Sequence, residues 1–218
     1  MRPEIKFCGM TRSEDVLAAG ELGAAYVGFI FAGGPRAVSP ARARGLKAHL
    51  PSGVKCVGVF GAERELGAPA DVARSVGLDV IQLHGDPNAA LVREVRRGFS
   101  GAVWTALRLA GGTLPPSAAA LFEVADAVVL DSYSPNALGG TGIPLPWEEL
   151  ASAVGVIRSR AQLVLAGGLR PETVGAAVRA LQPDVVDVSS GVESAPGIKD
   201  PVKLRAFRDA VWAEGRTT

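Results

Sequence analysis

The stretch QLVLAGGLRPETVGAAVRALQPDVVDVSS, residues 162–190, decides the fold. It begins with a short β-rich run at 162–168 that ends in two glycines. Pro171 then opens a helical segment at 171–180, since proline suits the first turn of a helix. A second β-rich run follows at 185–190. The order strand, helix, strand predicts that the two strands are parallel, because a short hairpin cannot join parallel neighbours.

The same alternation runs through the whole chain. The expected strands occupy residues 5–9, 25–31, 55–60, 79–84, 102–107, 127–131, 162–168 and 185–190. The expected helices lie near residues 13–22, 40–49, 69–76, 87–97, 115–123, 147–157, 171–180 and 200–213. Eight units in 218 residues (218/8, about 27 each) predict an α/β fold with one (β/α)8 TIM barrel over residues 1–218. An open doubly wound sheet is the alternative, but its usual Gly-rich fingerprint does not follow the first strand.

The composition describes a chain that is long enough to bury a core and carries almost no net charge. Hydrophobic residues make up 48%, and 23 basic and 22 acidic residues are mixed along the sequence. This balance favours neither nucleic-acid nor membrane-surface binding, because both favour a basic patch. No stretch approaches 18 apolar residues, and the N-terminus lacks the apolar region of a signal peptide. We therefore expect a cytoplasmic protein without nucleic-acid or membrane partners, either monomer or homodimer.

The cysteine pattern argues against a structural metal or a disulfide framework. Cys8 and Cys56 are the two cysteines, and they lie too far apart for a Cys-x-x-Cys pair. Neither a disulfide set nor a zinc site is therefore predicted, and we expect no metal.

In a (β/α)8 barrel the active site lies at the C-terminal ends of the strands, so polar residues there are candidates for function. The residues at or just after the expected strand ends are Cys8, Phe31, His84, Arg108, Asp131, Gly167, Gly168, Ser189 and Ser190. This set is unusually polar for positions that converge on one mouth.

Two of these strand ends predict a phosphate site. One strand runs into Gly167-Gly168 before a helix, and another ends in Ser189-Ser190-Gly191. Barrels of this kind often hold a phosphate between the loops after strands seven and eight. Glycines let backbone N–H groups approach the phosphate oxygens. A single Gly-Gly pair would equally be a tight turn, but two such loops in the two expected places predict a phosphorylated small molecule as ligand.

Asp131 and Cys8 are the candidates for proton transfer. Asp131 follows four apolar strand residues, where a carboxylate is costly unless it is paired, faces the mouth or caps the next loop. That loop contains Gly140, Thr141 and Gly142 and is long enough to close over a ligand. Cys8 alone could be a small buried hydrophobe. A thiol that faces a carboxylate across a phosphate-binding mouth suits general acid–base catalysis.

Three further residues are predicted to support the site. Lys6 shares a strand face with Cys8, so it would be an interior cation paired with a carboxylate that the sequence does not identify. His84 would be a base, a hydrogen-bond donor or a loop anchor, and we favour a supporting role. Arg36 follows a Gly-Gly-Pro loop and would be solvated surface, or would fork onto a substrate carboxylate.

These motifs together resemble the phosphoribosylanthranilate isomerase family of tryptophan biosynthesis. The resemblance runs in the family's order through KFCGMT, YVGFIF, PRAVSP, KCVGVF, IQLHGD, VLDS, LGGTG, LAGGL and a last motif made of VDVSSGVES and, after one intervening residue, PGIKD. It implies a cofactor-free Amadori rearrangement of N-(5-phosphoribosyl)anthranilate to 1-(2-carboxyphenylamino)-1-deoxyribulose 5-phosphate.

The resemblance also implies roles for individual residues. Cys8 matches the family's general base and Asp131 its general acid. Arg36 matches the residue near the anthranilate carboxylate. The loops Gly167-Gly168-Leu169 and Ser189-Ser190-Gly191 match the phosphate cradle. A base must be a thiolate and an acid must stay protonated, so we expect both Cys8 and Asp131 to titrate towards neutrality.

The chain departs from the family's pattern at two places. Ala37 stands where an aromatic residue often follows Pro-Arg, and Leu145-Pro146 precedes Trp147 where the family often has Phe-Asp. Both departures concern packing around the anthranilate ring and neither touches the acid, the base or the phosphate loops.

Three other functions are open from the sequence. A histidine-pathway aminoaldose isomerase, or a barrel that accepts both substrates, would perform the same chemistry, but the histidine-pathway family has an aspartate where this chain has Cys8. A thiol enzyme would use Cys8 as a nucleophile with a histidine base, and His49 and His84 are the histidines available. A non-catalytic phosphosugar-binding barrel is the third.

Overall fold

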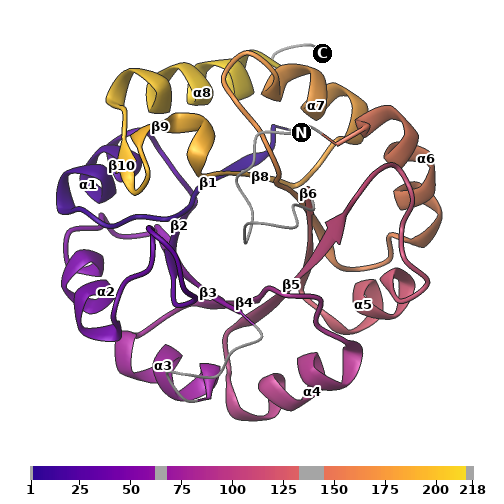
Figure 1. Ribbon diagram of the computed structural model, residues 1–218, viewed down its shortest axis with the longest axis horizontal. Helices are drawn as coiled ribbons and strands as arrows, with labels where there is room; N and C mark the ends of the chain where they lie inside the picture. The colour runs from indigo at the N-terminus through magenta and orange to yellow at the C-terminus, as the bar shows by residue number, and fades with distance from the viewer. Residues whose placement is uncertain (1, 62–67, 133–144, 215–218) are drawn as a thin grey trace.

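The computed structural model describes residues 2–61, 68–132 and 145–214, in which eight parallel strands close into a barrel inside a ring of helices (Figure 1). Strands that follow one another along the chain pair in the order β1 to β8. The barrel closes where β8 pairs with β1, with Asp187 opposite Lys6. The predicted (β/α)8 barrel is therefore confirmed.

The elements have the following bounds. The barrel strands are β1 (Glu4–Phe7), β2 (Tyr26–Ile30), β3 (Lys55–Phe60), β4 (Val80–Leu83), β5 (Ala102–Leu109), β6 (Ala127–Ser132), β7 (Gln162–Leu165) and β8 (Val185–Val188). The helices are α1 (Ser13–Glu21), α2 (Pro40–Lys47), α3 (Pro69–Val76), α4 (Ala89–Gly98), α5 (Ala118–Val124), α6 (Trp147–Ile157), α7 (Val174–Leu181) and α8 (Pro201–Glu214).

Several predicted boundaries are wrong by one to three residues, each for a local reason. The strand predicted at 5–9 ends at Phe7, because Gly9 takes a φ of +72°, a left-handed backbone in which a strand cannot continue. Cys8 therefore lies just past the strand, at the barrel mouth. The helix predicted near 87–97 begins at Ala89, because the Asn88 side chain accepts a hydrogen bond from Leu91 N at 2.9 Å and caps it.

A small hairpin between β8 and α8 is absent from the sequence prediction. After β8 the chain forms a 3₁₀ turn, η1 (Ser190–Val192), and then the antiparallel strands β9 (Glu193–Ala195) and β10 (Ile198–Lys199). These strands are too short to give a periodic pattern. Figure 1 shows the hairpin on the rim of the barrel, beside α1 and α8.

The interior of the barrel is apolar in its lower part, towards the N-terminal ends of the strands, and polar at the mouth, which lies at their C-terminal ends. Alternate residues of a strand point inward, so in β6 the inward residues are Ala127, Val129 and then Asp131. The lower part is filled by a cluster that includes Tyr26 and Trp104, whose ring centroids are 4.9 Å apart at 62°. A second, larger apolar cluster packs the outer faces of the strands against the helices. The closed base leaves the mouth as the place for polar chemistry.

Three aspartates recur at the foot of the barrel. Asp79, Asp126 and Asp184 directly precede β4, β6 and β8. Their Oδ2 atoms accept hydrogen bonds from Cys56 N at 2.8 Å, Val103 N at 2.8 Å and Leu163 N at 2.7 Å, each donor being the second residue of the preceding strand. Each carboxylate therefore joins the starts of two neighbouring strands.

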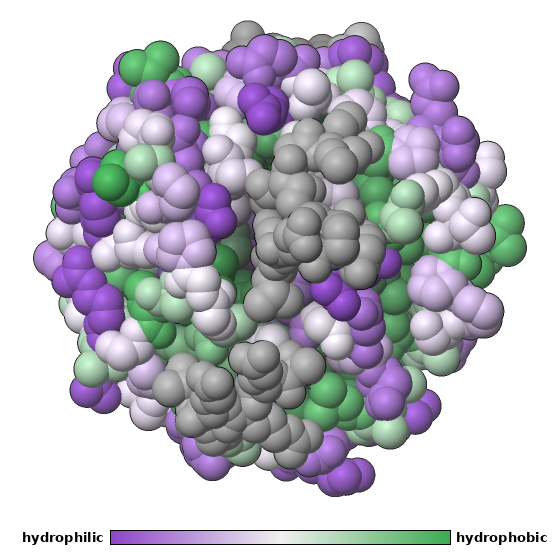
Figure 2. All heavy atoms as spheres, in the orientation of Figure 1, coloured by the Kyte–Doolittle hydropathy of each residue, from purple (hydrophilic) through white to green (hydrophobic). Residues whose placement is uncertain are grey.

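The visible surface carries interspersed hydrophilic and apolar residues (Figure 2). Val156 and Val202 are the most exposed large hydrophobic side chains among those described, at 86% and 76%, and they belong to the separate helices α6 and α8. Within the described residues, the helices are all too short or too polar to cross a lipid bilayer.

Candidate active site

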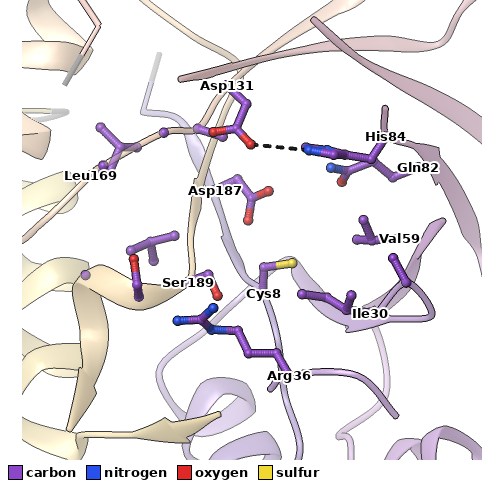
Figure 3. A pocket seen from close by; sticks show the side chains of 17 residues that line it. Cys8, Ile30, Arg36, Val59, Gln82, His84, Asp131, Leu169, Asp187 and Ser189 are labelled. Atoms are coloured by element: carbon purple, nitrogen blue, oxygen red, sulfur yellow. Dashed lines mark ion pairs between the residues drawn. The ribbon is translucent and has the colours of Figure 1, made fainter. Parts of the chain in front are cut away.

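A pocket opens at the C-terminal ends of the strands and collects almost all of the predicted site residues (Figure 3). It is lined by Cys8, Ile30, Ala32, Arg36, Val59, Gln82, His84, Asp131, Ala166, Gly167, Gly168, Leu169, Asp187, Val188, Ser189, Ser190 and Gly191. Lys6 lies beneath it in the barrel interior. Gly140, Thr141 and Gly142 fall outside the described residues. Among the described residues, no group of three or more His, Cys, Asp or Glu side chains is placed to hold a metal ion.

Asp131 is a buried carboxyl group whose environment favours its protonated form. It lies near the end of β6 with 7% of its surface exposed. Burial, and then the negative charge of Asp187, raise its pKa to about 7, against the smaller opposing effects of the Ser132 backbone N–H, Lys6 and Arg108. The expectation that Asp131 titrates near neutrality is confirmed, so this group is able to carry a proton at neutral pH.

Cys8 differs from the expectation. Its thiol is 7% exposed and packs against the backbone of Gly28, where a Cβ atom would lie only 2.6 Å from the sulfur. Burial raises the pKa of Cys8 above its ordinary value, although Lys6 and Lys199 both act to lower it. The prediction that the Cys8 pKa moves down towards neutrality is therefore wrong, because desolvation of the thiolate outweighs the two lysines.

Lys6 has the carboxylate partner that the sequence could not identify. Its Nζ atom, which is fully buried, lies 2.5 Å from Asp187 Oδ2 and 2.9 Å from Gln82 Oε1. Although burial lowers the pKa of Lys6, the charge of Asp187 raises it above its ordinary value, so the ammonium group stays charged. The interior cation predicted from strand alternation is confirmed.

Asp187 is a site residue that the sequence prediction missed. It lies on the inward face of β8, and its Oδ1 atom is buried without a hydrogen-bond partner among the described residues. In the view of Figure 3 it lies between Asp131 and Cys8. The alternation in residues 185–189 was a usable signal, because it places Asp187 on the same face as Ser189.

His84 is neutral at neutral pH. Burial, with the charges of Arg108 and Lys6, lowers its pKa to about 4. Its Nε2 atom is 3.8 Å from Asp131 Oδ2, the contact drawn dashed in Figure 3. That separation is too long for a hydrogen bond, and a neutral imidazole makes no ion pair. Both ring nitrogens are buried without a hydrogen-bond partner in the described structure, so His84 has its hydrogen-bonding capacity available to a ligand.

Arg36 is held at the pocket edge by a carboxylate. Its Nη2 atom is 2.7 Å from Glu193 Oε2 and its Nε atom 2.9 Å from Glu193 Oε1. The Arg36 side chain is 19% exposed, so it is not solvated surface. Lys199 Nζ donates to the same Glu193 Oε1 at 2.9 Å. Neither Glu193 nor Lys199 was among the predicted site residues, although both lie near the end of the last family-like motif.

The two loops predicted to bind phosphate lie against each other. Gly167 and Gly168 take φ angles of +80° and +66°, and Ser189, Ser190 and Gly191 lie opposite. A Cβ atom at Gly191 would lie 1.9 Å from the Leu169 carbonyl oxygen, so only glycine permits this contact. The sequence prediction that these six residues converge at the mouth agrees with their placement.

The two departures from the family pattern lie outside this pocket lining. Ala37 is exposed and forms an isolated bridge with Ile30. Leu145 is 4% exposed and packs in the outer core, and Pro146 precedes α6.

Comparison with known proteins gives one consistent family. The family model for N-(5'-phosphoribosyl)anthranilate isomerase matches residues 5–210. A curated Pseudomonas aeruginosa N-(5'-phosphoribosyl)anthranilate isomerase is 42% identical over 215 residues, which cover 97% of this chain and 96% of that protein. The same enzyme of Geobacter sp. is 42% identical over 206 residues, covering 94% of this chain and 95% of that protein.

Solved structures agree. Phosphoribosyl anthranilate isomerase from Thermotoga maritima superimposes with a TM-score of 0.86 at 34% identity, over 97% of this chain and 99% of that one. A complex of such an isomerase with reduced 1-(o-carboxyphenylamino)-1-deoxyribulose 5-phosphate gives a TM-score of 0.81 at 33% identity, over 97% and 99%.

Proposed function

The chain belongs to the N-(5'-phosphoribosyl)anthranilate isomerase family, and from that premise we propose that Cys8 and Asp131 carry its Amadori rearrangement as general base and general acid. The chain is thus an isomerase of tryptophan biosynthesis. One observation carries the residue assignment: a thiol and a carboxyl group with a pKa of about 7 line the same pocket as two Gly/Ser loops.

The first step opens the sugar ring. Protonated Asp131 gives its proton to the furanose ring oxygen while the C1′–O bond breaks. The anthranilate nitrogen lone pair forms a C=N bond to C1′ and leaves an iminium ion. A carboxyl group that is protonated near neutrality suits this step, whereas an ordinary aspartic acid would already be ionised.

The second step moves a proton from carbon. Cys8, as thiolate, takes the C2′ proton, and the electron pair of that bond forms C1′=C2′ as the iminium nitrogen regains its lone pair. The enolamine then loses the proton of its C2′ hydroxyl and gains one at C1′, which gives the ketone. Atoms and charge balance over the two steps together, so the product is an isomer of the substrate.

The substrate carries an anionic group at each end, a phosphate and a carboxylate, and each would need hydrogen-bond donors in the pocket. The phosphate would lie between the loops at 167–169 and 189–191, where backbone N–H groups are available. The anthranilate carboxylate would lie on Arg36, which lines the pocket and whose Nε and Nη2 atoms are held by Glu193. A charge-assisted hydrogen bond from a guanidinium group is directional and suits a carboxylate.

We further propose that the reaction needs no metal or organic cofactor. An aldose–ketose rearrangement moves protons without net oxidation, and the substrate's own nitrogen accepts the electron pair as an iminium ion. Full activity after exhaustive dialysis against a chelator is the expected result. Activity that is lost and then restored by zinc or magnesium would contradict it.

The protein is also expected to work in the cytoplasm, as a monomer or a homodimer. A Thermotoga maritima relative is described as dimeric, which leaves both states open for this chain. Light scattering on the purified protein would decide between them.

One assay tests the proposed function directly. Phosphoribosylanthranilate is fluorescent, so the purified protein should remove its fluorescence in a time- and enzyme-dependent way. The histidine-pathway aminoaldose, tested in parallel, should not turn over. Turnover of the second substrate alone would overturn the substrate assignment, and no turnover of either would overturn the activity.

A further inference from the structure

Glu193 is a buried carboxylate that engages two cations at the pocket edge. It opens the hairpin strand β9 and is 8% exposed. Its Oε2 atom accepts from Arg36 Nη2 at 2.7 Å, and its Oε1 atom accepts from both Arg36 Nε and Lys199 Nζ at 2.9 Å. This side-on arrangement fixes the plane of the Arg36 guanidinium group as well as its position.

The same cluster ties down the loop after β8. Lys199 Nζ also donates to the Ser189 carbonyl oxygen at 3.1 Å, and Ser189 lines the pocket. The Lys199 backbone N–H donates to Asp15 Oδ2 at 3.1 Å, which anchors the hairpin to α1. Glu193 therefore connects Arg36, through Lys199, to the pocket-lining loop that carries Ser189.

The Arg36 side chain packs closely against the backbone of Gly9. A Cβ atom at Gly9 would lie 2.8 Å from Arg36 Cδ and 2.9 Å from Ser189 Oγ. The arginine stem therefore passes directly over the Gly9 backbone, next to Ser189. Glu193 then determines where the end of this side chain points.

Two cations share the Glu193 carboxylate. Arg36 and Lys199 both pair with it, and burial lowers the pKa of Lys199 although the charge of Glu193 acts to raise it. Of these three groups Arg36 is the one that lines the pocket, so its guanidinium group is the cation that a ligand carboxylate would meet.

We propose that Glu193 is a positioning residue for Arg36, which sets the place of the substrate's aromatic carboxylate relative to the phosphate loop at Ser189. The inference rests on the proposed function, since it takes Arg36 to bind that carboxylate. It adds a residue that acts through Arg36 and touches no reacting atom.

The test compares two ligands by calorimetry. One is reduced 1-(o-carboxyphenylamino)-1-deoxyribulose 5-phosphate, and the other is the same compound without the aromatic carboxylate. Glu193→Gln should weaken binding of the first roughly 10- to 100-fold, the size of a lost charge-assisted hydrogen bond, and should leave the second within about 2-fold. In kinetics KM should rise with kcat nearly unchanged, because the lost interaction is present in both ground and transition states.

Arg36→Met provides the thermodynamic cycle. It should abolish the preference for the carboxylated ligand, and Glu193→Gln should add no further loss in that background. The matched control is Glu214→Gln, which breaks an Arg179–Glu214 pair between α7 and α8, away from the pocket. It should change neither affinity.

The outcomes separate the two hypotheses. If Glu193→Gln weakens both ligands equally, Glu193 is structural and the inference is overturned. If Arg36→Met leaves the preference for the carboxylate intact, the assignment of Arg36 in the proposed function fails instead. Should Glu193→Gln not fold, Glu193→Asp keeps the charge and shortens the reach by one methylene. The same selective loss is expected, and equal weakening again overturns the inference.

Discussion

Lys6 and Asp187 form an ion pair inside the barrel, with Lys6 Nζ 2.5 Å from Asp187 Oδ2, and the charges of this pair shift the pKa of both proposed proton-transfer groups, Cys8 and Asp131. The charge of Asp187 raises the pKa of Asp131 and of Cys8, and that of Lys6 lowers both. For Asp131 the result suits an acid. For Cys8, burial dominates and leaves a thiol. In the free enzyme the productive combination of thiolate and carboxylic acid is therefore a minor population.

The first prediction concerns the Cys8 thiol. In a Cys56→Ala background, alkylation of Cys8 by iodoacetamide should rise with pH at a midpoint above that of a small free thiol in the same buffer. The reason is that burial disfavours the thiolate, and alkylation requires the thiolate. Mass spectrometry of the modified peptide gives the rate. A midpoint below that of the free thiol would mean that the lysines prevail over burial.

The second prediction concerns catalysis. Cys8→Ala and Asp131→Asn should each lower kcat/KM by about 10²- to 10⁴-fold, the usual contribution of a positioned acid or base. Affinity for the reduced product analogue should persist, because the phosphate loops are unchanged. Cys56→Ala is the control, since it removes the other buried thiol from the outer core and should leave kcat nearly native. Near-native turnover by Cys8→Ser would show that Cys8 is only a core residue.

The third prediction links Asp131 to stability. Its folded-state pKa of about 7 lies above the ordinary value of 3.8, so between these pH values the native state binds more protons than the unfolded state. Stability due to this group is therefore fully present below the unfolded pKa and is lost as pH rises through the folded pKa. Asp131→Asn, which is always neutral, should raise the urea midpoint at pH 8 by an amount that shrinks towards zero at pH 4. A variant less stable than the native protein at pH 8 would contradict this.

The fourth prediction concerns the foot of the barrel. Asp126→Ala and Asp184→Ala should each lower the free energy of unfolding by about 1–3 kcal/mol, because each leaves a strand N–H without its acceptor. Urea unfolding gives the value. Asp209→Ala removes an exposed carboxylate that pairs with its neighbour Arg208, and it should cost far less. Equal effects at the three positions would show that the aspartates do not act as caps.

Much of this architecture could be predicted from the sequence because it depends on local patterns. The alternation of β-rich and helical runs predicted the barrel, and the expected strand ends predicted that Cys8, His84 and Asp131 would lie at the mouth. The direction of the Asp131 pKa shift was expected from the acid role that the family resemblance implies. The roles of these residues in catalysis remain predictions.

The remaining features depend on contacts between distant segments. Lys6 and Asp187 are 181 positions apart in the chain, so no spacing could pair them. The Cys8 pKa depends on a competition between burial, which raises it, and the charges of two lysines, which lower it. The sequence shows neither how deeply the thiol is buried nor how close the lysines lie. The partnership of Arg36 with Glu193 depends on a hairpin whose strands are two and three residues long.

The three aspartates at the N-terminal ends of the strands also lie at a constant sequence separation from the pocket residues. Asp79, Asp126 and Asp184 are each followed five positions later by a pocket residue: His84, Asp131 and Ser189. The hydrogen bond of each aspartate fixes where its strand begins, so the side chain five residues later lies at the mouth whatever its type. Imidazole, carboxyl and hydroxyl groups thus occupy equivalent positions in the three strands. A protein engineer could therefore replace the residue at any of these positions and expect the new side chain to lie in the pocket, because the aspartate still fixes the start of the strand.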